Sequence, residues 1–247
     1  MIKTIVITGA TSGFGKACAE HFAKHQWQLI LIGRRHERLL QLQQQLGSCV
    51  KQIFAVDVRN REEIFTQLDQ LEDIDVLLNN AGLALGLEPS WKVDIDDWET
   101  MVDTNIKGLM YCTRALLPQM VKRNIGHIVN IGSTAGSWPY PGGNAYGGTK
   151  AFVQQFSRNL RADLLGTKVR ITNLEPGMAE SEFSQVRFKG DIKSADKFYQ
   201  GVDSLQPADI AETVYWIVNR PPHVNINSIE MMTIDQAWGP LAVNRGD

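Results

Sequence analysis

The sequence predicts an α/β fold in which helices cover both faces of a doubly wound parallel sheet of about seven strands. Short apolar runs alternate with longer segments of helical spacing along the chain, and this alternation is typical of parallel sheets. Several runs, such as LILI at 29–32, are apolar on both faces. Strands buried between two layers of helices have this composition.

The apolar runs give the expected strands in chain order. They lie at 2–8, 28–33, 52–57, 74–79, 127–133, 168–174 and 228–234. Segments of helical spacing separate them, and three of these lie at 14–25, 37–46 and 61–71. No repeat, low-complexity segment or linker interrupts the pattern, so we expect one domain over residues 1–247.

Two stretches depart from the alternation. Residues 178–206 are polar with scattered Phe and Tyr, and we treat them as a candidate lid over a substrate site. The tail at 235–247 contains Trp238, Gly239 and Pro240, and it is a candidate contact with another subunit.

The composition argues against several classes of function. Of 247 residues, 43% are hydrophobic and 21% are charged, and the net charge is -2, which gives no reason to expect nucleic acid or an anionic membrane as a partner. Cys18, Cys49 and Cys112 form no C-x-x-C pair, which argues against disulfides and a metal site. The apolar runs are too short to span a bilayer, and the N-terminus runs straight into a strand pattern rather than a signal peptide, so we expect a cytoplasmic protein.

A glycine-rich turn follows the first expected strand. TGATSGFG at 8–15 places Gly9, Gly13 and Gly15 before the first helix. Glycine lets a phosphate approach the backbone N–H groups at a helix N-terminus, where the helix dipole favours an anion. The spacing differs from the common G-x-G-x-x-G, and a turn without a ligand is the alternative. The position between strand and helix favours a dinucleotide.

The second expected strand indicates which dinucleotide. It ends in LIGRR at 31–35, with no acidic residue to bind a ribose 2′-hydroxyl. Guanidinium groups can bind a 2′-phosphate, so Arg34 and Arg35 predict NADP. The alternative, a solvated helix start, is more credible for Arg35 and Arg38 than for Arg34. Asp57, at the end of the third strand, is expected to meet the adenine or to cap a helix.

The motifs together resemble those of the short-chain dehydrogenase/reductase family. TGATSGFG, NNAG at 79–82, a serine at the end of the fifth strand, Y-x-x-x-K and EPG at 175–177 occur in that family's order. The resemblance implies a Rossmann-like fold and a catalytic tetrad of Asn105, Ser133, Tyr146 and Lys150. It also implies a cofactor site made of Gly9, Thr11, Ser12, Gly13, Phe14, Gly15, Arg34, Arg35, Asp57, Val58, Asn80, Ala81, Tyr146, Lys150, Pro176 and Gly177.

These residue types suit hydride transfer between a nicotinamide and a carbonyl, in which the protein handles the proton. If a helix begins at 144, Tyr146 and Lys150 lie one turn apart, and the lysine can lower the tyrosine pKa. Ser133 can donate a hydrogen bond to the substrate oxygen, and Asn105 could hold a water that links Lys150 to solvent. Each residue taken alone has a structural alternative: a surface aromatic, a solvated charge, a loop hydroxyl or a capping residue.

The residues expected around the substrate are less well defined by the sequence. Trp138 and Tyr140 could form an apolar wall or pack in the core. Arg187 and Lys189, in EFSQVRFKGD at 182–191, stand out because a cation beside the nicotinamide would favour a carboxylate. The alternative is that both are solvated. We assign Arg187, with Ser133 and Tyr146, to the substrate.

Longer stretches, including GLALGLEPS at 82–90 and HVNINSIEMM at 223–232, resemble the bacterial NADP-dependent 3-hydroxy acid dehydrogenases. This resemblance implies serine, allo-threonine or malonic semialdehyde as substrates, and a homotetramer with helices from 108–123 and 146–165 between subunits. An NADPH-dependent reductase of uncharged ketones or aldehydes is one alternative. A non-catalytic NADPH-binding regulator and a scaffold that binds no dinucleotide are alternatives from other classes.

Overall fold

The computed structural model describes residues 2–238 and contains one parallel sheet with the strand order β3-β2-β1-β4-β5-β6-β7. The strands are β1 (Thr4–Thr8), β2 (Gln28–Ile32), β3 (Val50–Phe54), β4 (Val76–Asn79), β5 (Gly126–Ile131), β6 (Val169–Pro176) and β7 (Ser228–Met231). The order reverses between β1 and β4, and such a point is where doubly wound sheets bind ligands. The predicted fold is confirmed.

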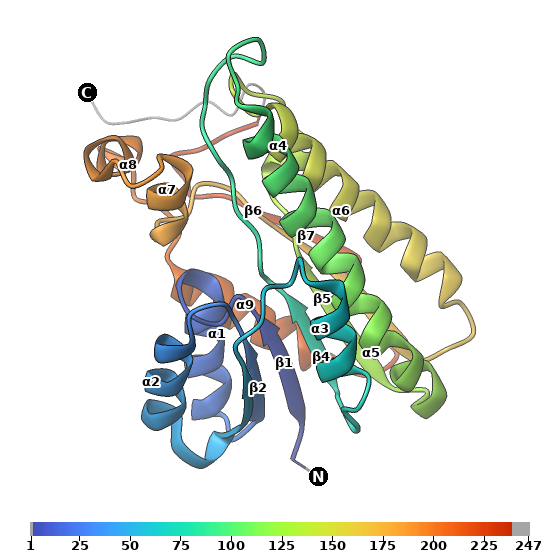
Figure 1. Ribbon diagram of the computed structural model, residues 1–247. Helices are drawn as coiled ribbons and strands as arrows, with labels where there is room; N and C mark the ends of the chain where they lie inside the picture. The colour runs from blue at the N-terminus through green and yellow to red at the C-terminus, as the bar shows by residue number, and fades with distance from the viewer. Residues whose placement is uncertain (1, 239–247) are drawn as a thin grey trace.

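The helices form a layer on each face of the sheet (Figure 1). The α-helices are α1 (Gly13–Lys24), α2 (His36–Leu46), α3 (Arg61–Leu68), α4 (Ile95–Val102), α5 (Leu109–Arg123), α6 (Asn144–Asp163), α7 (Glu182–Arg187), α8 (Ile192–Tyr199) and α9 (Pro207–Val218). Two single turns of 3-10 helix, η1 (Gly47–Cys49) and η3 (Thr134–Gly136), and a π-helical segment, η2 (Asp103–Gly108), complete the chain path.

The two layers follow from the side-chain alternation of the strands. In β1, Ile5 and Ile7 pack with α1, α2 and α9, whereas Val6 packs with α3, α5 and α6. All three side chains are fully buried. Since successive strand residues point to opposite faces, a strand with two apolar faces needs a helical layer on each side.

Several expected boundaries were displaced in the structure. The third strand is Val50–Phe54 rather than 52–57, so Asp57 lies in the loop beyond the strand. The fifth strand ends at Ile131, and Ser133 caps η3, with its Oγ accepting a hydrogen bond from the Ala135 N–H at 3.1 Å. Strand ends depend on where ladder hydrogen bonds stop, which an apolar pattern does not define.

Residues 178–206 fold as α7 and α8, which pack against each other. They lie beyond the upper ends of the strands in the view of Figure 1. The Leu205 N–H donates to the Met178 carbonyl at 3.1 Å, which closes the segment at its base. Of the tail at 235–247, only the part up to Trp238 lies within the described residues, and Trp238 donates a hydrogen bond from its Nε1 to Glu230.

Candidate active site

A cavity of about 280 Å³ opens at the carboxyl edge of the sheet, over the point where the strand order reverses. It is lined by every predicted cofactor, substrate and catalytic residue except three, Gly15, Asn105 and Arg187. Residues from α7 form part of its wall. The fold therefore brings the separate motifs of the sequence to one place.

The glycine turn meets the steric needs of its position. Gly9 has φ +66° and Gly13 has φ +50°, in the left-handed region that favours glycine. Gly15 was predicted to belong to the cofactor site together with Gly9 and Gly13. It lies behind the turn, where an added Cβ would come within 2.3 Å of the Gly9 carbonyl oxygen. It permits close packing of α1 on the turn and does not line the cavity.

The NNAG loop is fastened to the glycine turn by Thr8. The Thr8 Oγ1 accepts hydrogen bonds from the N–H groups of Asn80 and Ala81, both at 3.0 Å. The Asn80 Nδ2 donates to the Thr8 carbonyl at 2.9 Å. Sequence reasoning missed Thr8, because a threonine at the end of an apolar strand carries no signal of such contacts.

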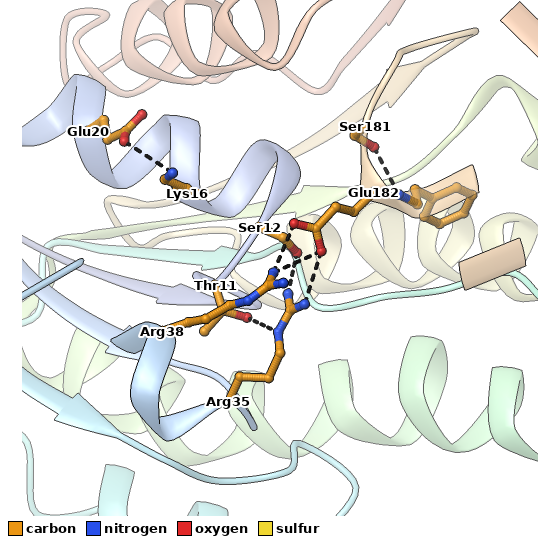
Figure 2. Close-up of polar contacts among 9 residues, drawn as sticks. Thr11, Ser12, Lys16, Glu20, Arg35, Arg38, Ser181 and Glu182 are labelled. Carbon is orange, nitrogen blue, oxygen red and sulfur yellow. Dashed lines mark hydrogen bonds and ion pairs between the residues drawn. The ribbon is translucent and has the colours of Figure 1, made fainter. Parts of the chain in front are cut away.

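At the end of β2, Arg34 and Arg35 line the cavity but differ in their partners. The Arg34 Nη1 lies 3.8 Å from Asp57. Arg35 donates from Nε to the Thr11 Oγ1 at 3.1 Å and from Nη2 to the Ser12 Oγ at 2.7 Å (Figure 2). The guanidinium of Arg35 therefore lies against the glycine turn, and the alternative of a merely solvated helix start does not describe it.

Asp57 is held by Arg59, which donates to the carboxylate from its side chain at 2.7 Å and from its backbone N–H at 3.0 Å. Partial burial raises the pKa of Asp57, but the hydrogen bonds and charge of Arg59 outweigh it and leave that pKa below its ordinary value. The N-cap of α3 is Asn60. The helix-cap interpretation of Asp57 is therefore wrong.

Tyr146 and Lys150 lie one turn apart on α6, as predicted from a helix that begins at 144. Both are buried, at 8% and 6% exposure. Burial raises the pKa of Tyr146 to about 12, and the charge of Arg187 opposes this rise. Burial lowers the pKa of Lys150 to about 8.

The cation that favours the Tyr146 phenolate here is Arg187 rather than the expected Lys150. The Lys150 Nζ lies 5.7 Å from the Tyr146 ring centroid and donates to the Ile131 carbonyl at 2.7 Å. A hydrogen bond between Tyr146 and Ser133 also favours the phenolate. Ser133 and Tyr146 are therefore neighbours in the cavity lining, where both can reach the same substrate oxygen.

Asn105 lies in the π-helical segment η2, and such irregular turns are frequent at functional sites. Its Oδ1 accepts from the Leu83 N–H at 2.9 Å, and its Nδ2 donates to the Leu83 carbonyl and to the Thr149 Oγ1 at 2.8 and 3.0 Å. Both amide protons are used. These bonds order the loop after β4, and the expected role of Asn105 in holding a water for Lys150 stays a prediction.

Arg187, on α7, is only 7% exposed and is surrounded by aromatic rings. Its guanidinium carbon lies 5.2 Å from the centroids of Tyr146 and Phe183 and 5.7 Å from that of Phe198. Its Nη2 donates to the Tyr140 hydroxyl at 3.4 Å, while its buried Nε has no hydrogen-bond partner. A buried cation with an unused donor beside Tyr146 is suited to an anionic ligand.

Two other sequence candidates lie elsewhere. Lys189 forms an ion pair with Asp97 at 2.7 Å, so its charge is already balanced. Trp138 donates from Nε1 to Glu230 at 3.1 Å and does not line the cavity. Glu182 and Phe183 line the cavity but were not singled out, since their position depends on how α7 packs.

Over residues 2–238, no group of three or more His, Cys, Asp or Glu side chains could hold a metal ion. Within the same residues, no helix has both the length and the apolar character needed to cross a bilayer.

Comparison with known proteins gives matches over almost the whole chain. It is 57% identical over 246 residues to the NADP-dependent 3-hydroxy acid dehydrogenase YdfG of Salmonella typhi, covering 98% of this chain and 99% of that protein. It is 49% identical over 251 residues to sulfoacetaldehyde reductase 2 of Chromohalobacter salexigens, covering 99% and 100%.

Two solved structures are also similar. The closed form of serine dehydrogenase complexed with NADP+ matches with a TM-score of 0.94 and 54% identity, covering 98% of this chain and 100% of that one. Serine dehydrogenase from Escherichia coli matches with a TM-score of 0.83 and 50% identity, covering 95% and 100%. Residues 3–191 match the short chain dehydrogenase family. With the glycine turn, Ser133, Tyr146 and Lys150 gathered at one cavity, this match shows that the chain belongs to the short chain dehydrogenase family.

Proposed function

We propose that this protein is an NADP-dependent dehydrogenase that oxidises the 3-hydroxyl group of small 3-hydroxy acids and catalyses the reverse reduction. The observation that carries the proposal is the buried guanidinium of Arg187, 5.2 Å from the Tyr146 ring centroid. A carboxylate bound there brings the adjoining hydroxyl-bearing carbon toward Tyr146 and Ser133. Relatives that act on 3-hydroxy acids and on sulfoacetaldehyde have substrates with an acidic group in common.

The residues of the cavity fit NADP. The turn from Gly9 to Gly13 gives a phosphate access to backbone N–H groups, and Arg34 and Arg35 stand at the end of β2 where an NAD-preferring site has a carboxylate. We assign the 2′-phosphate to these two arginines and the adenine side to Asp57 and Val58. When bound, NADP accepts or supplies the hydride.

The protein residues manage the proton and the substrate. In oxidation, Tyr146 takes the proton of the substrate hydroxyl while the carbonyl forms, and in reduction it returns that proton. Ser133 donates a hydrogen bond to the reacting oxygen. We assign Lys150, whose Nζ lies 5.7 Å from the Tyr146 ring centroid, to the cofactor ribose. In the unliganded protein the Tyr146 pKa of about 12 keeps the hydroxyl protonated at neutral pH, as the reduction requires.

We further propose malonic semialdehyde as a substrate of the reductive direction, because it is the oxidised partner of a 3-hydroxy acid. A homotetramer in the cytoplasm is proposed on the family resemblance, with α5 and α6 between subunits. Two partly exposed apolar side chains of α5, Met110 and Val121, support that assignment. Free cysteines at 18, 49 and 112 suit a reducing compartment.

The absorbance at 340 nm tests the proposal with purified protein, L-serine and either NADP or NAD. Growth of the signal with NADP and little growth with NAD is the expected result. No growth with either would remove the substrate assignment. Turnover of uncharged carbonyls with NADPH, in that case, would identify the protein as a neutral ketone or aldehyde reductase.

A further inference from the structure

The carboxylate of Glu182, the first residue of α7, bridges two arginines of the second βα unit (Figure 2). Its Oε2 accepts from the Arg35 Nη1 at 3.0 Å. Both of its oxygens lie 2.9 Å from the Arg38 Nη1. Partial burial raises the pKa of Glu182, but hydrogen bonds and charge from the two arginines outweigh it, so the group is ionised at neutral pH.

Arg35 connects this bridge to the cofactor cavity. The same guanidinium that meets Glu182 also donates to Thr11 and Ser12 in the glycine turn. Arg35 and Glu182 both line the cavity, whereas Arg38 does not. Arg35 is therefore available to a phosphate in the cavity, and Arg38 can keep hold of Glu182 when Arg35 turns to that phosphate.

The helix that Glu182 begins carries the groups that cover Tyr146. The Phe183 ring lies 5.7 Å from the Tyr146 ring, and Arg187 stands at the other end of α7. That far end is fastened separately. The Gly86 N–H donates to the Arg187 carbonyl at 2.9 Å, and Lys189 pairs with Asp97. The Glu182 bridge fastens the end of α7 nearest the glycine turn.

We propose that Glu182 is a positioning residue that couples the two ends of the site: it holds α7, with Phe183 and Arg187, over Tyr146 and competes with a 2′-phosphate for Arg35. The inference rests on the proposed function, because it assumes that Arg35 meets the 2′-phosphate and Arg187 the substrate carboxylate. Loss of the Glu182 carboxylate then has effects of opposite sign: the substrate binds more weakly and a 2′-phosphate binds more tightly.

The test is Glu182→Gln in the full-length protein, with three measurements. Hydrogen exchange of residues 182–188 becomes about fivefold faster, because the N-terminal end of α7 opens more often. KM for L-serine at saturating NADP rises about five- to tenfold, because α7 spends less time in its position over Tyr146. The affinity for 2′-AMP, measured by calorimetry, rises by up to about fivefold. This factor corresponds to the free energy of an exposed ion pair.

Two variants separate the causes. Lys189→Gln releases the other end of α7, so it raises exchange and KM and leaves 2′-AMP affinity unchanged. Glu20→Gln removes a carboxylate that pairs with Lys16 on α1 and accepts a hydrogen bond from Gln45 on α2, so all three values stay at wild-type level. Glu182→Asp, which keeps the charge on a shorter side chain, recovers part of the loss in KM.

Unchanged exchange and unchanged KM in Glu182→Gln would overturn the proposal. A parallel weakening of 2′-AMP and serine binding with a lower Tm would overturn it too, since that pattern is general structural damage. Exchange and 2′-AMP binding do not require turnover. If wild-type protein fails to oxidise serine, the proposed function fails, while these two measurements still decide whether Glu182 fastens α7 and competes for Arg35.

Discussion

The guanidinium of Arg187 lies against the ring of Tyr146, with 5.2 Å between the guanidinium carbon and the ring centroid. The two residues come from α7 and α6, which are distant in the sequence. The contact joins the acid–base group to the cation assigned to the substrate carboxylate. It also makes Arg187 the charge that opposes the rise in the Tyr146 pKa caused by burial.

Replacement of Arg35 tests the cofactor assignment. Arg35→Ala should weaken NADP binding about ten- to hundredfold, the value of a hydrogen bond between charged groups, and leave NAD binding nearly unchanged. Titration of the protein with each dinucleotide, followed by calorimetry, measures both affinities. Arg220→Ala is the matched control, because Arg220 stacks on Trp216 and does not line the cavity. Equal losses for NADP and NAD in Arg35→Ala would remove the 2′-phosphate from this side chain.

The lowered pKa of the buried Lys150 amine leads us to expect that the stability of the protein depends on pH. Its pKa is lowered from the ordinary 10.5 to about 8 in the folded protein, so between these values the unfolded chain binds more protons and stability rises with pH. From pH 8 to pH 10 the free energy of unfolding of the wild type should gain about 2 kcal/mol relative to Lys150→Met. Urea denaturation of the cofactor-free proteins at both pH values measures this difference. A difference that is constant with pH would show that Lys150 titrates normally.

We expect the substitution Asn105→Ala to lower both the stability and the activity of the protein. Asn105→Ala leaves the N–H and carbonyl of Leu83 without their side-chain partner and removes a donor to the Thr149 hydroxyl, all in a buried region. We expect the free energy of unfolding to fall by about 2–4 kcal/mol, as measured by urea denaturation. If activity is lost while stability is unchanged, the side chain acts in proton transfer rather than in ordering the loop.

The fold and the cofactor cavity were largely predictable from local patterns. Two-faced apolar runs required two helical layers, and glycine at 9 and 13 marked the turn before α1. Tyr146 and Lys150 were placed on one helical face by their spacing alone. Local patterns suffice where the constraint arises within one element or between neighbouring elements.

Contacts between distant segments could not be predicted from the sequence. The spacing around Gly15 does not show that Gly9 and Asn80 crowd it, and a lone Asn105 does not show that Leu83 will use its amide. The pairing of Arg35 with Glu182 likewise depends on where α7 packs. Each of these interactions is set by tertiary structure, so the residue type alone supported several roles.

Arg187 is the group that we assign to the substrate carboxylate. The decisive measurement compares KM of Arg187→Ala and wild type for L-serine and for an uncharged alcohol, both at saturating NADP. Lys16→Ala, which removes a cation paired with Glu20 on α1 and outside the cavity lining, is the control for general charge effects. We predict that Arg187→Ala raises KM for L-serine about ten- to hundredfold and changes KM for the uncharged alcohol less than about threefold. Equal increases for both substrates would contradict the carboxylate role of Arg187.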